Sequence, residues 1–173
     1  FADLLEIGTE RRYDIYDLSM QVPEPLVPRR LRFEVPERLG PDGRVLEALD
    51  EAEALAVARR IAGSGVAAVA ICLLHAFRNP RHEHRLREIL RREAPGVVVC
   101  ISSDVMPEIG EYERTSTTVC NAYVLPVFDT YLKRLTEGLR GRGVTKDLYR
   151  MLSDGGTVHE STAAAYPVRL VQS

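Results

Sequence analysis

Two nearly unbroken apolar runs, residues 66–74 and 97–101, constrain the fold of this 173-residue chain more than any other feature. Both are rich in small and β-branched residues, which is typical of parallel strands that are covered on both faces. Between the runs lies a helical segment, with an Asn-Pro start signal at 79–80 and a Pro-Gly stop signal at 95–96. The order strand, helix, strand predicts a βαβ unit with a right-handed crossover, and hence an α/β fold.

The segment before the first apolar run predicts a hairpin and a helix. Residues 31–35 and 45–47 alternate apolar and polar side chains around the turn signal Gly-Pro-Asp-Gly at 40–43. This pattern predicts an antiparallel hairpin over about 31–48. Asp50, with a glutamate three residues later, resembles a capping box, so we expect a helix from there to about Ala62.

The segment after the second apolar run changes character. Residues 108–140 predict a long helical stretch that is interrupted near Pro126. A strand over 147–152, a short helix over 161–165 and a last strand from 168 follow. The order predicts a sheet lobe, a helical bridge and the beginning of a second lobe. Because the chain lacks an initiator Met and stops inside a strand pattern, we expect it to be a piece of a larger protein.

Composition narrows the function classes. The formal net charge is −2 and no apolar run is long enough to span a bilayer, so we expect neither a nucleic-acid nor a membrane partner. Cys72, Cys100 and Cys120 are far apart and form no C-x-x-C pair. This usage predicts buried free thiols in a reducing compartment, and hence a cytoplasmic protein.

Polar residues follow both predicted parallel strands. His75 comes after the first strand, and Ser102, Ser103 and Asp104 come after the second. Ligands of parallel sheets bind outside the carboxyl ends of the strands, so His75 is either an acid–base or contact group or a structural histidine. The two serines and the aspartate could cap the next helix equally well.

The helix between the strands begins with His82-Glu83-His84, which looks like a ligand cluster. Residues two apart on a helix point to different sides, so we expect a solvated face instead. Glu83 would then pair with Arg87 at the i,i+4 spacing.

Two further segments are candidate sites. Glu111 and Arg114 precede the hydroxyl run that begins at Thr115, which is either a ligand surface or an ordinary solvated helix start. Ser153, Asp154, Gly155 and Gly156 follow a predicted strand, where glycines let backbone amides approach a phosphate. The same residues are also common turn chemistry.

Several segments together resemble the hydantoinase A/5-oxoprolinase family, which includes N-methylhydantoinase A and acetone carboxylase β-type subunits. The resemblance covers the chain in order. It rests on FADLLEIG at 1–8, YDL with PEPLVP at 16–28, SSDVMPEIGEYERTSTTV at 102–119 and MLSDGG at 151–156.

The resemblance implies a fragment of an actin-like (ribonuclease H-like), two-lobed ATPase fold. Residues 1–104 would complete the first lobe, 105–143 would form the bridge and 144–173 would start the second lobe. Family members use ATP and Mg²⁺ or another divalent metal to open hydantoin or 5-oxoproline rings, or to carboxylate ketones. The resemblance therefore implies a small cyclic amide substrate and a B-type partner subunit. It makes Glu111 and Arg114 candidate catalytic residues. Candidate substrate or nucleotide contacts are His75, Thr115, Ser153, Asp154, Gly155 and Gly156.

The departures from the family pattern are informative as well. The two phosphate loops of the family are absent, Asp154 stands where Asn is common, and Gly110 replaces the usual Arg. We therefore expect the isolated chain to bind ATP poorly and to be inactive. An uncovered sheet edge would favour a homo-oligomer. The alternatives are an ATP-dependent ketone carboxylase subunit of the same family and a non-catalytic α/β interaction module. Flanking sequence with both phosphate loops would favour the enzyme over the module.

Overall fold

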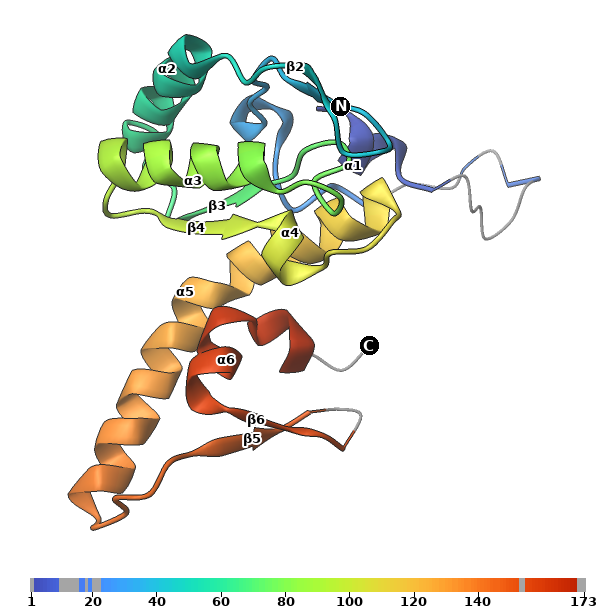
Figure 1. Ribbon diagram of the computed structural model, residues 1–173. Coiled ribbons are helices and arrows are strands. Elements are labelled where there is room, and N and C mark those ends of the chain that lie inside the picture. Colours follow the sequence, from blue (N-terminus) through green and yellow to red (C-terminus); the bar gives the residue numbers. More distant parts are fainter. Residues whose placement is uncertain (1, 10–15, 18, 20–22, 153–154, 171–173) are drawn as a thin grey trace.

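The structure is a computed structural model that describes residues 2–9, 16–17, 19, 23–152 and 155–170 (Figure 1). Its centre is a parallel pair of strands, β3 (Ala68–Ile71) and β4 (Val98–Ile101), in register from Ala68 opposite Val98 to Ile71 opposite Ile101. Helix α3 (Arg81–Glu93) connects the two strands. The predicted βαβ unit is therefore confirmed.

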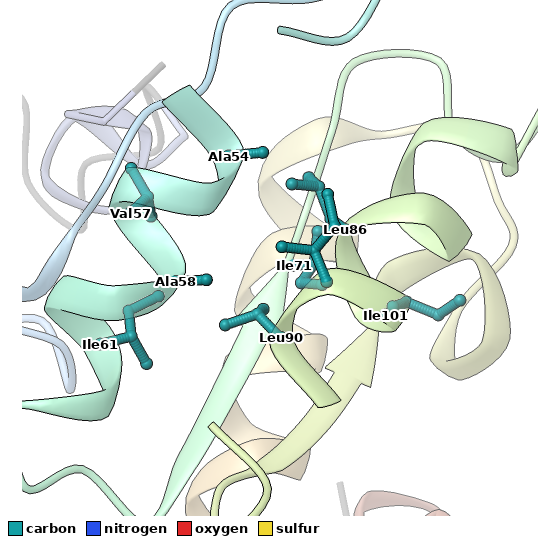
Figure 2. Close-up of a cluster of buried hydrophobic side chains, with 9 residues drawn as sticks. Ala54, Val57, Ala58, Ile61, Ile71, Leu86, Leu90 and Ile101 are labelled. Atoms are coloured by element: carbon teal, nitrogen blue, oxygen red, sulfur yellow. The ribbon is translucent and has the colours of Figure 1, made fainter. Parts of the chain in front are cut away.

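Helices α2 (Glu51–Ala62) and α3 cover one face of this strand pair (Figure 2). The Asp50 carboxylate accepts hydrogen bonds from Ala52 N and Glu53 N, both at 3.0 Å, which confirms the predicted helix start. The apolar stripe of α2 then faces that of α3 over the strands. The buried cluster consists of Ala54, Val57, Ala58, Ile61, Ile71, Leu86, Ile89, Leu90 and Ile101.

The N-terminal part contains α1 (Leu4–Ile7), the 3₁₀ helix η1 (Arg29–Leu31) and a hairpin of β1 (Arg38–Leu39) and β2 (Val45–Glu47). The hairpin and its turn at 40–43 are confirmed, but its first strand is not Leu31–Val35. A tight turn at 40–43 brings only the residues directly before it opposite β2, as the bond from Gly40 N to Arg44 O (2.8 Å) shows. Residues 32–35 lie outside any strand.

The other face of the sheet is covered by the long helix α5 (Glu111–Gly141), which follows the short α4 (Ser102–Val105). The predicted interruption near Pro126 is wrong, because α5 runs through that residue. Proline already has a helical φ, so it removes one hydrogen bond without forcing the helix to end. The helix lies within 105–143, where the sequence predicts a bridge, and the division into lobes stays a prediction.

The chain ends in a second, smaller part that packs on α5. Strands β5 (Tyr149–Met151) and β6 (Thr157–His159) form an antiparallel hairpin, and α6 (Glu160–Ala165) and the 3₁₀ helix η2 (Pro167–Leu170) follow. The strand expected over 147–152 and the short helix are confirmed, whereas β6 was not predicted. The last expected strand is wrong over 168–170, where Pro167 begins a 3₁₀ turn, and residues 171–173 lie outside the described residues. No described helix is long and apolar enough to cross a membrane.

Candidate functional site at the strand ends

The carboxyl ends of β3 and β4 lie side by side because the strands are parallel and in register. The turn after β3 carries His75, and β4 runs directly into α4, which begins at Ser102. Open parallel sheets bind ligands at this edge. The structure thus places His75 and the Ser102–Asp104 segment after the carboxyl ends of two neighbouring strands.

Glu83 forms the polar centre of this edge. Its side chain is fully buried, with 0% exposure. Oε1 accepts hydrogen bonds from Leu73 N (3.0 Å) and from Ser102 Oγ (2.6 Å), and Oε2 accepts one from Ser103 N (2.9 Å). Leu73 N lies beyond the last paired residue of β3, and Ser103 N lies in the first turn of α4. Backbone N–H groups at these places have no hydrogen-bond partner within the strand pair or the helix. One carboxylate from α3 therefore joins the ends of both strands.

The expected solvated face at 82–84 is wrong for two of its three residues. His82 is buried, and its Nδ1 lies 2.7 Å from Oε2 of Glu37, in the segment before β1. Glu83 is buried as described above, and Arg87 pairs with Asp104 (2.5 Å) instead of Glu83. The signal that could have found this is spacing, because positions 82 and 83 precede the buried Leu86 and Leu90 by helical intervals.

Arg114 approaches the same edge from α5 and is also fully buried. Its Nη2 donates to the Leu73 carbonyl (2.8 Å) and its Nη1 to the Glu108 carbonyl (3.3 Å). The guanidinium also lies 5.5 Å from the centre of the Phe77 ring. Glu83 thus binds the amide of Leu73 while Arg114 binds its carbonyl. These contacts are those of a residue that positions the turn after β3.

His75 sits in that positioned turn with a left-handed backbone, φ 57°. A non-glycine residue there is strained, and strain of this kind collects at functional sites. The His75 carbonyl accepts hydrogen bonds from Arg78 N (2.9 Å) and Asn79 N (3.3 Å). Its half-buried ring meets the Phe77 ring edge-on at 6.1 Å. The His75 side chain therefore keeps access to solvent at this edge, whereas that of Glu83 does not.

The hydroxyl run on α5 faces inward in part. Thr118 is buried and its Oγ1 donates to the Arg114 carbonyl (2.6 Å), whereas Thr115 is half-buried. Oγ1 of Thr115 is buried and has no hydrogen-bond partner among the described residues. Glu111 is half-buried in the first turn of α5, so these contacts leave its expected role open to experiment.

The three cysteines are free; Cys100 is buried, and Cys72 and Cys120 are half-buried. Burial raises the pKa of the Cys72 thiol to about 12, and the nearby Glu83 carboxylate acts in the same direction. A thiol with this pKa is protonated near neutral pH and is a poor nucleophile. Cys72 is therefore a packing residue of this edge.

The glycine pair Gly155 and Gly156 lies away from the ends of β3 and β4. Gly155 (φ 84°) and Gly156 belong to the turn between β5 and β6, closed by the bond from Leu152 N to Gly156 O (2.7 Å). Ser153 and Asp154 fall outside the described residues. Figure 1 shows this hairpin in the lower part of the molecule, below α6, whereas β3 and β4 lie near the centre. The structure therefore does not join the glycine pair to His75 and Arg114.

Within the described ranges, no three His, Cys, Asp or Glu side chains gather as a metal site would require. The described residues therefore do not by themselves fit a divalent cation.

A parallel strand pair with polar groups at the carboxyl ends of its strands defines an α/β protein with a candidate site at the strand ends. Comparison with known proteins identifies its family. Residues 1–94 match the hydantoinase/oxoprolinase N-terminal region, and residues 114–173 match the hydantoinase/oxoprolinase family. The chain therefore belongs to the hydantoinase/oxoprolinase family, which confirms the resemblance.

Three relatives are informative. Caprolactamase subunit alpha of Pseudomonas jessenii is 38% identical over 89% of this chain, and 5-oxoprolinase of Saccharomyces cerevisiae is 30% identical over 91%. The solved ATP-dependent caprolactamase superposes with a TM-score of 0.83 at 34% identity, covering 97% of this chain and 25% of that one. Nucleotide-free acetone carboxylase gives 0.84 at 27% identity, covering 97% and 26%. The chain spans only 22% of caprolactamase subunit alpha and 14% of that 5-oxoprolinase.

Proposed function

We propose that residues 1–173 are part of an ATP-dependent enzyme that opens a small cyclic amide. The observation that carries this proposal is the similarity to two proteins named for lactam rings, the caprolactamase at 38% identity and the 5-oxoprolinase at 30%. An amide carbonyl is a poor electrophile, and ATP would supply the activation that lets water open the ring. The larger fold would be the actin-like ATPase fold that the resemblance implies.

The second candidate is a ketone carboxylase of the same family. It is supported by the structural similarity to acetone carboxylase, which has a TM-score of 0.84. The two candidates share the use of ATP and differ in the substrate carbonyl, an amide in one and a ketone in the other.

Within this chain we assign distinct roles to the residues at the strand ends. His75 would contact substrate or nucleotide, because its imidazole keeps access to solvent on a strained, fixed turn. Arg114 would position that turn through its bond to the Leu73 carbonyl. Glu111 and Thr115, on the first turns of α5, stay candidates for contact with the reacting groups. Gly155 and Gly156 would approach a nucleotide only with residues from outside this chain.

Other components follow from the same proposal. ATP and a divalent cation such as Mg²⁺ would be held mainly by residues outside 1–173, since the described residues hold no metal cluster. The caprolactamase relative is a subunit alpha, which favours a partner subunit of the B type. A homo-oligomer and a cytoplasmic location are also part of the proposal.

The test is an assay of the full-length protein with its partner subunit. ATP hydrolysis is measured with caprolactam, 5-oxoproline or a hydantoin, and separately with acetone or acetophenone plus bicarbonate. We expect stimulation by a cyclic amide, and the isolated 173-residue chain should show none. Stimulation by ketone and bicarbonate alone would favour the carboxylase, whereas no stimulation by any of them would contradict both candidates.

The assigned roles are tested with His75→Gln and Arg114→Lys in the same protein. We expect His75→Gln to lower kcat without lowering Tm. Arg114→Lys retains a cation but loses the forked geometry of the guanidinium, so it should lower Tm and kcat together. Unchanged kinetics for His75→Gln would show that His75 takes no part in the reaction and has a structural role only.

A further inference from the structure

Glu83 and Arg114 are two buried groups of opposite charge that are bonded to neutral partners. Both side chains are fully buried, with 0% exposure. Glu83 accepts hydrogen bonds from two backbone amides and one serine hydroxyl, and Arg114 donates to two backbone carbonyls. A buried charge without compensation costs free energy, so each of these groups needs a counter-charge nearby.

Leu73 lies between the two charges. Its N–H donates to Glu83 Oε1 (3.0 Å), and its carbonyl accepts from Arg114 Nη2 (2.8 Å). The N–H carries partial positive charge and the carbonyl oxygen partial negative charge, so each end of Leu73 faces the group that attracts it. Because a single residue separates the carboxylate from the guanidinium, the two charges balance each other through a low-dielectric interior.

The thiol of Cys72, the neighbour of Leu73, responds to both groups. Burial raises its pKa most, the Glu83 carboxylate raises this pKa further, and the Arg114 guanidinium lowers it. The two charges therefore act on the same short stretch of backbone, one from α3 and the other from α5.

Leu73 is also the first residue of the turn that contains His75. Its carbonyl accepts a second hydrogen bond from Ala76 N (3.4 Å), which closes a tight turn with His75 at its third position. Some tight turns require a left-handed backbone at that position, as His75 has. The far side of the turn is held separately by Asn79, whose Nδ2 donates to the Gly43 carbonyl (2.9 Å). A shift of Leu73 would therefore move His75 directly.

We propose that Glu83 and Arg114 form one charge pair across Leu73, and that this pair fixes the position of the His75 imidazole. Glu83 is then a positioning residue, and Arg114 positions the turn only while the Glu83 carboxylate balances it. The role in the reaction rests on the proposed function, in which His75 contacts substrate or nucleotide. It holds for the cyclic amide and for the ketone alike.

A double-mutant cycle in the full-length protein tests the charge pair. Glu83→Gln and Arg114→Gln each remove one charge and keep a hydrogen-bonding side chain, and the double variant removes both charges. Each single variant leaves the other charge uncompensated, so we expect the double variant to lose less of the urea midpoint than the two single losses together. Additive losses would overturn the pair. If a single variant does not fold, recovery of folded protein in the double variant supports the pair, and no recovery overturns it.

The matched control for this cycle combines Ser102→Ala with Arg114→Gln. Ser102 Oγ bonds to the same carboxylate (2.6 Å) but carries no charge. We therefore expect these two losses to add. Coupling as large in the control cycle as between Glu83 and Arg114 would overturn the role of charge.

The reactivity of His75 tests the positioning without relying on enzyme activity. Diethyl pyrocarbonate modifies accessible imidazoles, and mass spectrometry follows the rate at His75 with His159 on β6 as the internal control. In Glu83→Gln and Arg114→Gln we expect His75 to react at least about 3-fold faster, because a released turn opens more often, while His159 reacts as before. An unchanged His75 rate in both variants would overturn the positioning role.

Kinetics connect the positioning to the reaction. We expect each single variant to lower kcat about 10- to 100-fold with a smaller change in KM, and Glu88→Gln, at an exposed carboxylate of α3, to leave both unchanged. Unchanged kcat in both single variants of an active enzyme would overturn the positioning role and leave the proposed function standing. If neither a ring nor a ketone stimulates ATP hydrolysis, the proposed function fails, whereas the cycle and the His75 rate still decide whether the pair exists and holds the turn.

Discussion

The two ends of the molecule are built differently although each contains two paired strands. Around β3 and β4, both faces are covered by helices, and even the polar groups Glu83, His82 and Arg114 are inside. Around β5 and β6, only Ala163 and Pro167 are buried among residues 144–170 that the structure describes. Tyr149 and Met151 of β5 remain 65% and 75% exposed. The difference shows that pairing two strands orders the backbone, whereas stability comes from what covers them.

The largest loss of stability is expected from substitution of Glu83. Glu83→Ala removes the acceptor of three hydrogen bonds and leaves Leu73 N, Ser102 Oγ and Ser103 N without it. We expect a loss of about 3–4 kcal/mol in the free energy of unfolding. Urea unfolding followed by circular dichroism measures it. Glu88→Ala, at an exposed carboxylate of the same helix, is the control and should cost less than about 0.5 kcal/mol. Equal midpoints for the two variants would refute a structural role for the buried carboxylate.

The second effect tests the contrast between the two ends directly. Leu90→Ala empties space in the core between α2, α3 and the strands, so we expect a loss of about 2–4 kcal/mol. Met151→Ala removes a similar side chain from the exposed β5 and should change stability by less than about 0.5 kcal/mol. The measurement is again the urea midpoint. If Met151→Ala lowers stability as much as Leu90→Ala, then Met151 is buried in solution, and the contrast between the two ends is wrong.

The smallest expected effect is a dependence of stability on pH that arises from Cys72, next to β3. In the folded chain the pKa of Cys72 is about 12, above its ordinary value of 9.0. Between these values the unfolded chain loses the thiol proton while the folded chain keeps it. The stabilisation that Cys72 contributes is therefore complete below pH 9 and falls as pH rises toward 12.

Urea midpoints at pH 8 and at pH 10.5 measure this dependence. We expect the midpoint of the unsubstituted chain to fall more over this interval than that of Cys72→Ala, which has no thiol to titrate. Cys120→Ala is the matched control, and it should lose stability with pH as the unsubstituted chain does. Parallel pH profiles for the unsubstituted chain and Cys72→Ala would show that the thiol titrates normally in the folded state.

Much of the β3 end could be predicted from the sequence because its signals are local. The apolar runs specify β3 and β4, and Asp50 specifies the start of α2, since each depends on neighbours along the chain. His75 and Ser102 could likewise be placed at the strand ends from their position directly after the runs.

The errors arose where long-range contacts decide the outcome. Glu83 and His82 are polar side chains that favour an exposed position, but Ser103 N and Glu37 stabilise them in the interior from 20 and 45 residues away. Pro126 usually ends a helix, yet α5 packs against β3 before it through Ala122, and after it Thr136 bonds to Glu160 of α6. The alternation at 31–35 is a strand pattern, but residues 32–35 form no strand. Partners distant in the chain leave no local signal, so such contacts required the structure.

The buried Asn121 couples the two ends of the molecule mechanically. Its Nδ2 donates to the Ala165 carbonyl (3.3 Å) and its Oδ1 accepts from Val168 N (3.2 Å), while Nδ2 also lies 3.5 Å from Sγ of Cys100 in β4. One planar amide on α5 thus contacts both the turn between α6 and η2 and the strand β4. Because this amide is fully buried, water does not replace a broken bond, so the contacts to α6, η2 and β4 are lost at a cost in stability. A single substitution at Asn121 would therefore loosen α6 and η2 from β4 at the same time.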